Sequence, residues 1–122
     1  MKHFAAALGC ILATTVLGLA EGRAEPAEEN YKLYCVQCHG TAGTGQGINQ
    51  TAGGLAVSPR DHTSAVEMSK LADDEIRLAV AKGGDAVKKS ELMPPWDEVL
   101  TGKEIDDLVA LMRKFCKCVQ VK

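Results

Sequence analysis

The stretch Cys35-Val36-Gln37-Cys38-His39 places two thiols and an imidazole within five consecutive positions. Two further cysteines, Cys116 and Cys118, follow much later and are separated by a single lysine. Three chemistries use side chains of this kind: covalent attachment of a haem, tetrahedral binding of zinc, and disulfide formation. The rest of the sequence has to distinguish between them.

Residues 1–24 have the pattern of a secretory signal peptide. Lys2-His3 forms a short basic region, an apolar run follows, and Gly22-Arg23-Ala24 offers small residues before a cleavage site. Cleavage after Ala20 fits the same pattern. The sequence therefore predicts an exported, periplasmic protein whose mature domain covers residues 25–122.

The composition favours a small domain that depends on a staple, a metal or a large cofactor. The chain has 14 basic and 16 acidic side chains and a net charge of −2, so no basic excess points to nucleic acid. Aromatic residues make up only 4% of the chain, which leaves little volume for a core. We expect no membrane span after removal of the signal peptide.

The sequence pattern predicts an all-α fold with three to four short helices and long loops. Helices are expected at residues 27–36, 73–82 and 101–115, the last opened by a capping box of Thr101 and Glu104. The glycine-rich segment 40–59 is expected to be loop, because glycine loses the most conformational freedom when it is fixed in a regular element. Such a loop makes sense if it wraps a rigid group.

Cys-X-X-Cys-His is the attachment motif of c-type haem. Thiols three positions apart lie on one helical turn, so Cys35 and Cys38 can both add to the vinyl groups on one edge of a porphyrin. His39 then lies below the iron as an axial ligand. The sequence therefore predicts one covalently attached haem c.

A haem used for electron transfer needs a second axial ligand, and methionine is the usual one. Met93 is the favoured candidate, because Pro94 and Pro95 stiffen its loop. Met112 is expected in the core on the apolar face of the last helix. Met68 lies in a polar setting and is disfavoured as a ligand.

Successive segments of the chain resemble landmarks of the small class I, or monohaem, cytochromes c. These segments are Tyr31–Gly40, Gly43–Gly47, Ser58–Asp61, Leu71–Gly84, Leu92–Trp96 and Thr101–Phe115. The resemblance covers nearly all of the mature chain, and the joint occurrence of the segments is more specific than the haem motif alone.

The resemblance implies a cytochrome c fold in which the first and last helices cross and loops wrap one haem. It implies His39 and Met93 as axial iron ligands, with the Pro59 carbonyl accepting the imidazole N–H of His39. The implied function is a one-electron carrier between redox partners, with no catalytic residues. The alternative is a haem-bearing electron-transfer subunit of a larger oxidoreductase complex.

The family pattern does not call for Cys116 and Cys118. They could complete a four-thiolate zinc site with Cys35 and Cys38, but this interpretation leaves His39 without a role. A redox thiol enzyme would need a strand before the first pair, and none is predicted. With a haem on the first pair, the second pair could form its own disulfide, link to a partner or a second copy, or supply an iron ligand in place of methionine.

Two polar features complete the predictions. His62 is expected to be a solvated loop side chain. Lys82, Lys88 and Lys89 flank the loop before Met93, and as a basic rim beside the haem edge they would steer an acidic partner.

Overall fold

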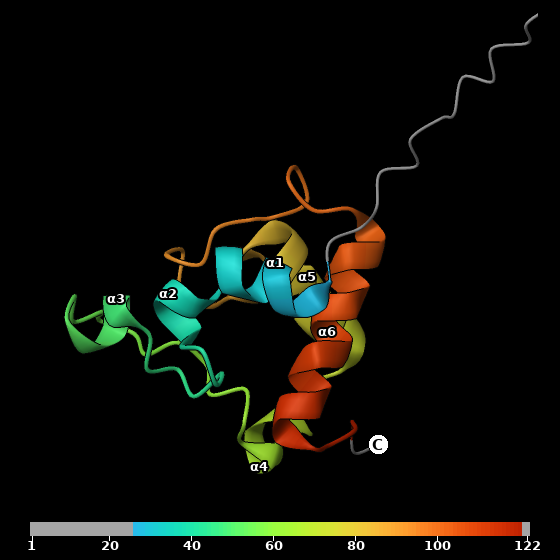
Figure 1. Cartoon of the computed structure of the whole chain (residues 1–122), viewed down its shortest axis with the longest axis horizontal. Helices are drawn as coiled ribbons and strands as arrows, with labels where there is room; N and C mark the ends of the chain where they lie inside the picture. The colour runs from blue at the N-terminus through green and yellow to red at the C-terminus, as the bar shows by residue number, and fades with distance from the viewer. Residues whose placement is uncertain (1–25, 121–122) are drawn as a thin grey trace, which may run out of the picture.

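The computed structural model describes residues 26–120 (Figure 1). The predicted signal peptide lies outside the described residues, so its cleavage site and the start of the mature domain stay predictions. Within the described range the chain is helical and contains no strand, which confirms the all-α fold class. The elements are α1 (Ala27–Tyr34), α2 (Val36–His39), α3 (Ile48–Thr51), α4 (Ala65–Met68), α5 (Asp73–Lys82), the 3-10 helix η1 (Asp85–Val87) and α6 (Gly102–Cys116).

The three predicted helices are present, and α5 has the predicted bounds. The helix expected at residues 27–36 is divided at Cys35, after which α2 continues to His39. Two four-residue helices, α3 and α4, were not predicted. A single turn of helix contains too few residues to show helical periodicity, which is why the sequence pattern misses it.

Among residues 26–120, helix α6 is the longest helix and carries half of the buried core residues. Its start is the predicted capping box, in which the Thr101 hydroxyl accepts from the Glu104 N–H at 3.3 Å. The Glu104 carboxylate accepts in return from the Thr101 N–H at 2.8 Å. The buried face of α6 consists of Ile105, Leu108, Val109, Leu111, Met112 and Cys116.

Helix α1 packs across α6, and α5 packs against α6 as well (Figure 1). Tyr31 of α1 is 2% exposed and meets the Phe115 ring edge to face, with centroids 5.2 Å apart. Met112 is buried, which confirms its place in the core. Met68 is also core, at 1% exposure, although its neighbours in sequence are polar, and that it is not an iron ligand stays a prediction. Its polar neighbours in sequence face outward from the short helix α4.

Arg113 connects the end of α6 to the segment between α4 and α5. Its guanidinium donates to the Met68 and Leu71 carbonyls, both at 2.7 Å, and forms an ion pair with Asp73 at 2.7 Å. The Arg113 side chain is only 12% exposed. Within residues 26–120, no helix is both long and apolar enough to span a membrane.

Candidate haem-attachment site

The Cys-X-X-Cys-His motif forms a helical turn at the end of α1. The Cys35 N–H donates to the Tyr31 carbonyl at 2.9 Å, and the His39 N–H donates to the Cys35 carbonyl at 2.9 Å. Cys35 and Cys38 are both half-buried and are not paired in a disulfide. The two thiols and the imidazole therefore come from one rigid turn, as the motif predicts.

The glycine-rich segment packs directly against this turn. The Gly45 N–H donates to the His39 carbonyl at 2.8 Å, and the Gly47 N–H donates to the Cys38 carbonyl at 3.0 Å. A Cβ atom at Gly47 would collide with the Gln37 carbonyl oxygen and lie 2.6 Å from the Cys38 carbonyl carbon. Only glycine allows the two backbones to approach this closely. Within this segment, Asn49 of the unpredicted helix α3 donates to the Cys38 sulfur at 3.4 Å.

The His39 ring is held by a hydrogen bond through Nδ1, which lies 3.0 Å from the Arg60 carbonyl oxygen. Because a carbonyl only accepts, Nδ1 carries the proton and the Nε2 lone pair is available as a ligand. Burial lowers the pKa of His39, which further favours the neutral ring. The residues present thus fit an axial imidazole ligand.

The prediction that Pro59 supplies this carbonyl was wrong by one residue. The Pro59 carbonyl instead faces Gly45, where an added Cβ atom would lie 2.5 Å from its oxygen. Successive carbonyls of a non-helical segment point in different directions, so the path of the chain decides which one reaches His39. The orienting role is present, but Arg60 performs it.

His62 is buried against the site, so the prediction of a solvated side chain was wrong. It is 5% exposed and stacks on His39 with ring centroids 4.3 Å apart and an interplanar angle of 17°. Its Nδ1 lies 3.1 Å from the Tyr31 hydroxyl. Burial, and then the nearby His39, lower the pKa of His62 to about 3, so its ring is neutral, and its Nδ1 shares one hydrogen bond with the tyrosine hydroxyl. Two rings stacked in this way cannot bind one iron from opposite sides.

The thiols of the motif are not poised as a dithiol redox centre. Burial, and then the neighbouring Cys38, raise the pKa of Cys35 to about 12. Catalytic Cys-X-X-Cys pairs show the opposite shift, because the thiolate is their nucleophile. A redox thiol enzyme would also need a strand before the first pair, and helix α1 precedes that pair instead, which counts against this interpretation.

The Met93 loop is fastened to the end of α5. The Gly84 N–H donates to the Met93 carbonyl at 2.9 Å, and a Cβ atom at Gly83 would lie 2.7 Å from that same oxygen. The backbone N–H of Trp96 donates to the Val80 and Ala81 carbonyls, both at 3.1 Å. The Met93 side chain is half-buried and packs against the core. The loop is thus held in one place, which an axial ligand requires.

Cys116 and Cys118 form a disulfide with each other. This pairing uses both thiols, so it contradicts the four-cysteine zinc site and leaves neither sulfur as a free thiol that could bind iron. Among residues 26–120, no group of three or more metal-ligating His, Cys, Asp or Glu side chains is assembled.

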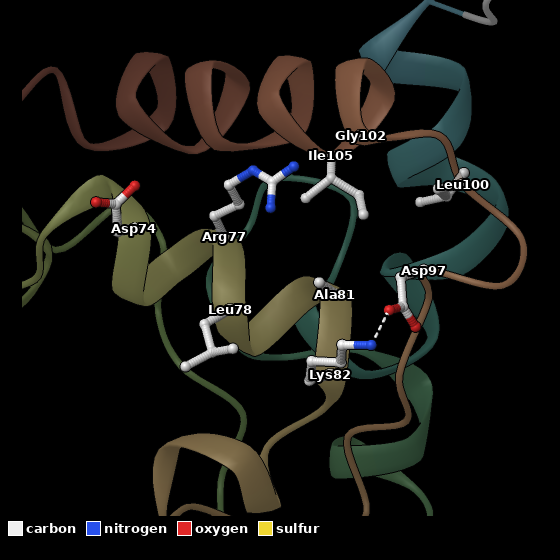
Figure 2. Close-up of a pocket in the computed structure, with 9 residues that line it drawn as sticks. All are labelled: Asp74, Arg77, Leu78, Ala81, Lys82, Asp97, Leu100, Gly102 and Ile105. Carbon is white, nitrogen blue, oxygen red and sulfur yellow. Dashed lines mark ion pairs between the residues drawn. The ribbon is translucent and has the colours of Figure 1, made fainter.

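A separate cavity of about 480 Å³ lies between α5 and α6, and Figure 2 shows the residues that line it. Its lining includes Arg77, Leu78 and Ile105 but no residue of the Cys-X-X-Cys-His turn. At its edge Lys82 forms an ion pair with Asp97, which raises the pKa of Lys82 (Figure 2). The cavity is therefore distinct from the haem-attachment site.

The three lysines of the predicted basic rim differ in whether an ion pair offsets their charge, and their place beside the haem edge stays a prediction. The charge of Lys82 is offset by its ion pair with Asp97. Lys88 and Lys89 are exposed, and neither forms an ion pair with another residue of the described part of the chain. Two of the three lysines therefore carry a positive charge that no ion pair within residues 26–120 offsets.

An all-α fold with a Cys-X-X-Cys-His turn and an oriented, neutral imidazole defines the class of c-type cytochromes. The model of the family described as cytochrome c oxidase, cbb3-type, subunit III matches residues 22–112, and the chain belongs to this family. Members of this class carry covalently attached haem c and transfer electrons, and both properties hold for this chain.

Solved structures of c-type cytochromes resemble the chain along most of its length. The KustC0563 c-type cytochrome has 26% sequence identity and a TM-score of 0.59, and the match covers 75% of this chain and 98% of that one. A mutant of that cytochrome, in which one tyrosine is replaced by phenylalanine, has 25% identity and a TM-score of 0.58, with 75% and 99% covered. A chain of the Kuenenia stuttgartiensis reducing HAO-like protein complex Kustc0457/Kustc0458 has 26% identity and a TM-score of 0.59, with 75% and 42% covered. No curated protein matches the sequence.

Proposed function

We propose that this chain is an exported one-electron carrier with a single haem c. Cys35 and Cys38 provide the two thioether bonds, and His39 and Met93 are the axial iron ligands. The observation that carries the proposal is the hydrogen bond from His39 Nδ1 to the Arg60 carbonyl, because it keeps the proton on Nδ1 and leaves the Nε2 lone pair available to bind iron.

The bound group supplies a one-electron couple between ferric and ferrous iron. The protein's part is to hold and orient the ligands and to keep water away. The Arg60 carbonyl increases the basicity of His39 by accepting a hydrogen bond from its Nδ1–H, and the His62 ring limits rotation of the His39 ring through their stacking. A methionine in the second axial position raises the reduction potential and closes the iron to small substrates.

The proposed partners are redox proteins that dock transiently, as suits a carrier that must bind and release. Lys88 and Lys89 are exposed cations in the loop between η1 and Met93, so they are suited to an acidic docking surface. Increasing ionic strength should slow electron transfer to such a partner and leave the absorption spectrum unchanged. A rate constant independent of ionic strength would remove the two lysines from the docking surface.

A second candidate is an electron-transfer subunit that stays bound to a larger oxidoreductase. The similarity to part of a chain in the HAO-like protein complex favours it. Sedimentation of the native protein from its source distinguishes the two, since a permanent subunit sediments with its partner at all salt concentrations and a carrier sediments as a small monomer.

The test of the iron ligands is the visible absorption spectrum of the protein expressed with its own leader in a host that attaches haem. We expect a reduced c-type spectrum and, in the oxidised form, the weak far-red band of methionine bound to ferric iron. Met93→Ala should abolish this band, whereas Met112→Leu should keep it, because Met112 is buried in the core on α6. A far-red band that survives in Met93→Ala would refute Met93 as the ligand.

Export is tested in the same preparation. We expect haem-containing protein in the periplasmic fraction, with an N-terminus at Glu21 or Glu25 by mass spectrometry. Haem-containing protein that retains Met1 in the cytoplasmic fraction would refute the proposed signal peptide.

A further inference from the structure

The Cys116–Cys118 disulfide has no role in holding the haem or in joining distant parts of the fold. It closes a ring around one residue, Lys117, at the end of α6. In the chain-entropy account, the stabilisation from a disulfide grows with the logarithm of the loop length, so a ring this small contributes little. Both sulfurs also belong to the same helix end, so no second element is fastened. A structural staple therefore explains the pair poorly.

The environment of Cys118 suits a thiolate. Its side chain is half-buried, and its sulfur lies 3.8 Å from Nη1 of Arg113. That guanidinium is held in place by the Met68 and Leu71 carbonyls and by the Asp73 carboxylate. Asp73 offsets part of the Arg113 charge, but a fixed guanidinium N–H next to a sulfur still stabilises the charged form of the reduced thiol, which is the nucleophile in thiol–disulfide exchange.

The environment of Cys116 suits a neutral thiol instead. Cys116 is 5% exposed, and its sulfur lies 3.4 Å from the Arg113 carbonyl oxygen. A carbonyl can accept a hydrogen bond from an S–H group and offers nothing to a thiolate. One sulfur of the pair therefore belongs to a half-buried residue and lies near a guanidinium, while the other belongs to a buried residue and lies near an acceptor. This difference favours Cys118 as the cysteine that forms the mixed disulfide with a partner and Cys116 as the cysteine that resolves it.

We propose that Cys116 and Cys118 form a second redox centre, which exchanges two electrons with a protein dithiol. A thiolate of the reduced partner attacks the sulfur of Cys118, the less buried residue of the pair, the bond between Cys118 and Cys116 breaks, and Cys116 leaves and takes up a proton. The second thiol of the partner then loses its proton and attacks the mixed disulfide, which releases Cys118 as the thiolate. The partner ends as a disulfide and this chain as a dithiol, so two electrons have moved. The reverse sequence oxidises the pair.

The first test compares Cys116→Ser with Cys118→Ser in the haem-containing protein. Each variant keeps one of the two thiols, and oxidised glutathione serves as the probe. Formation of the mixed disulfide is followed by intact mass. We expect Cys118, which remains in Cys116→Ser, to react about tenfold faster than Cys116 does in Cys118→Ser, because its thiolate is stabilised and its residue is less buried. Equal rates, or a faster Cys116, would overturn the assignment.

The second test uses the wild-type haem-containing protein and reduced thioredoxin as the dithiol probe. After alkylation, the folded protein should gain two alkyl groups within minutes, and oxidised thioredoxin should appear in equal amount. If the pair is reduced only after the protein is unfolded, it is structural and the proposal fails. The haem spectrum serves as the control, because neither serine variant touches the Cys-X-X-Cys-His turn. A failure of the haem proposal would change that spectrum, whereas a failure here would leave it intact.

Discussion

Gly47→Ala tests whether the close approach of the glycine-rich segment fastens the Cys-X-X-Cys-His turn. The backbone at Gly47 has φ −71° and ψ 167°, which alanine adopts without strain. Any cost must therefore come from the new methyl group. That methyl group meets the Gln37 carbonyl oxygen and the Cys38 carbonyl carbon, which are backbone atoms and cannot rotate away.

The magnitude follows from three contributions. Overpacking against atoms that cannot move costs about 1–3 kcal/mol. Displacement of the segment weakens the 3.0 Å hydrogen bond from the Gly47 N–H to the Cys38 carbonyl, which costs about 1 kcal/mol. Alanine regains about 0.4–1 kcal/mol by restricting the unfolded chain. The net loss of unfolding free energy is about 2 kcal/mol, which for a domain of this size lowers the melting temperature by roughly 8–16 °C.

The measurement is thermal unfolding of the haem-containing protein, followed by circular dichroism and by the haem absorption band. The matched control is Gly102→Ala at the start of α6. There the added Cβ atom would meet only the end of the Arg77 side chain, 3.1 Å away, which can move. We expect the control to match or slightly exceed the wild type in stability. If Gly47→Ala melts at the temperature of Gly102→Ala, the packing of the segment on the turn does not stabilise the fold.

Three further changes probe the cap of α6, the Tyr31–His62 contact and the Asp61 turn. Thr101→Ala removes the acceptor for the Glu104 N–H and should cost about 1 kcal/mol in urea unfolding, whereas Thr101→Ser should retain most of the stability. Tyr31→Phe leaves the buried Nδ1 of His62 without its hydrogen-bond partner and should cost about 1–3 kcal/mol, more than Tyr34→Phe; equal losses in the two variants would count against this contact. Hydrogen bonds from the Thr63 side chain, and then from the Thr63 and Ser64 backbone, lower the pKa of Asp61. Because the folded-state pKa is the lower one, this contribution is complete above about pH 4 and is lost as the pH falls further. Asp61→Asn has no carboxyl group to titrate here, so its free energy of unfolding should fall less than that of the wild type between about pH 6 and about pH 2. Equal falls in the variant and the wild type would refute this contribution of Asp61.

Features that depend on neighbours in the sequence could be predicted from the residues alone. The capping box at Thr101, the bounds of α5 and the all-α class rest on spacing and on local hydrogen bonds. The Cys-X-X-Cys-His motif is also local, because one turn of helix sets the distance between its thiols. For these features the sequence contains the whole physical cause, and the structure confirms the elements that it predicts.

Features that depend on where distant segments meet required the tertiary structure. The carbonyl of Arg60, and not that of Pro59, accepts the hydrogen bond from His39 Nδ1–H because the path of a loop decides which carbonyl points at the ring. His62 is buried because that loop turns it onto His39, although nothing in its neighbouring residues marks it as apolar. Arg113 looks like an ordinary helix-terminal cation in the sequence, yet it faces the Cys118 sulfur and clamps two carbonyls from another segment. In each case the orientation of one group relative to a segment remote in the chain is decisive, and a local pattern does not contain that information.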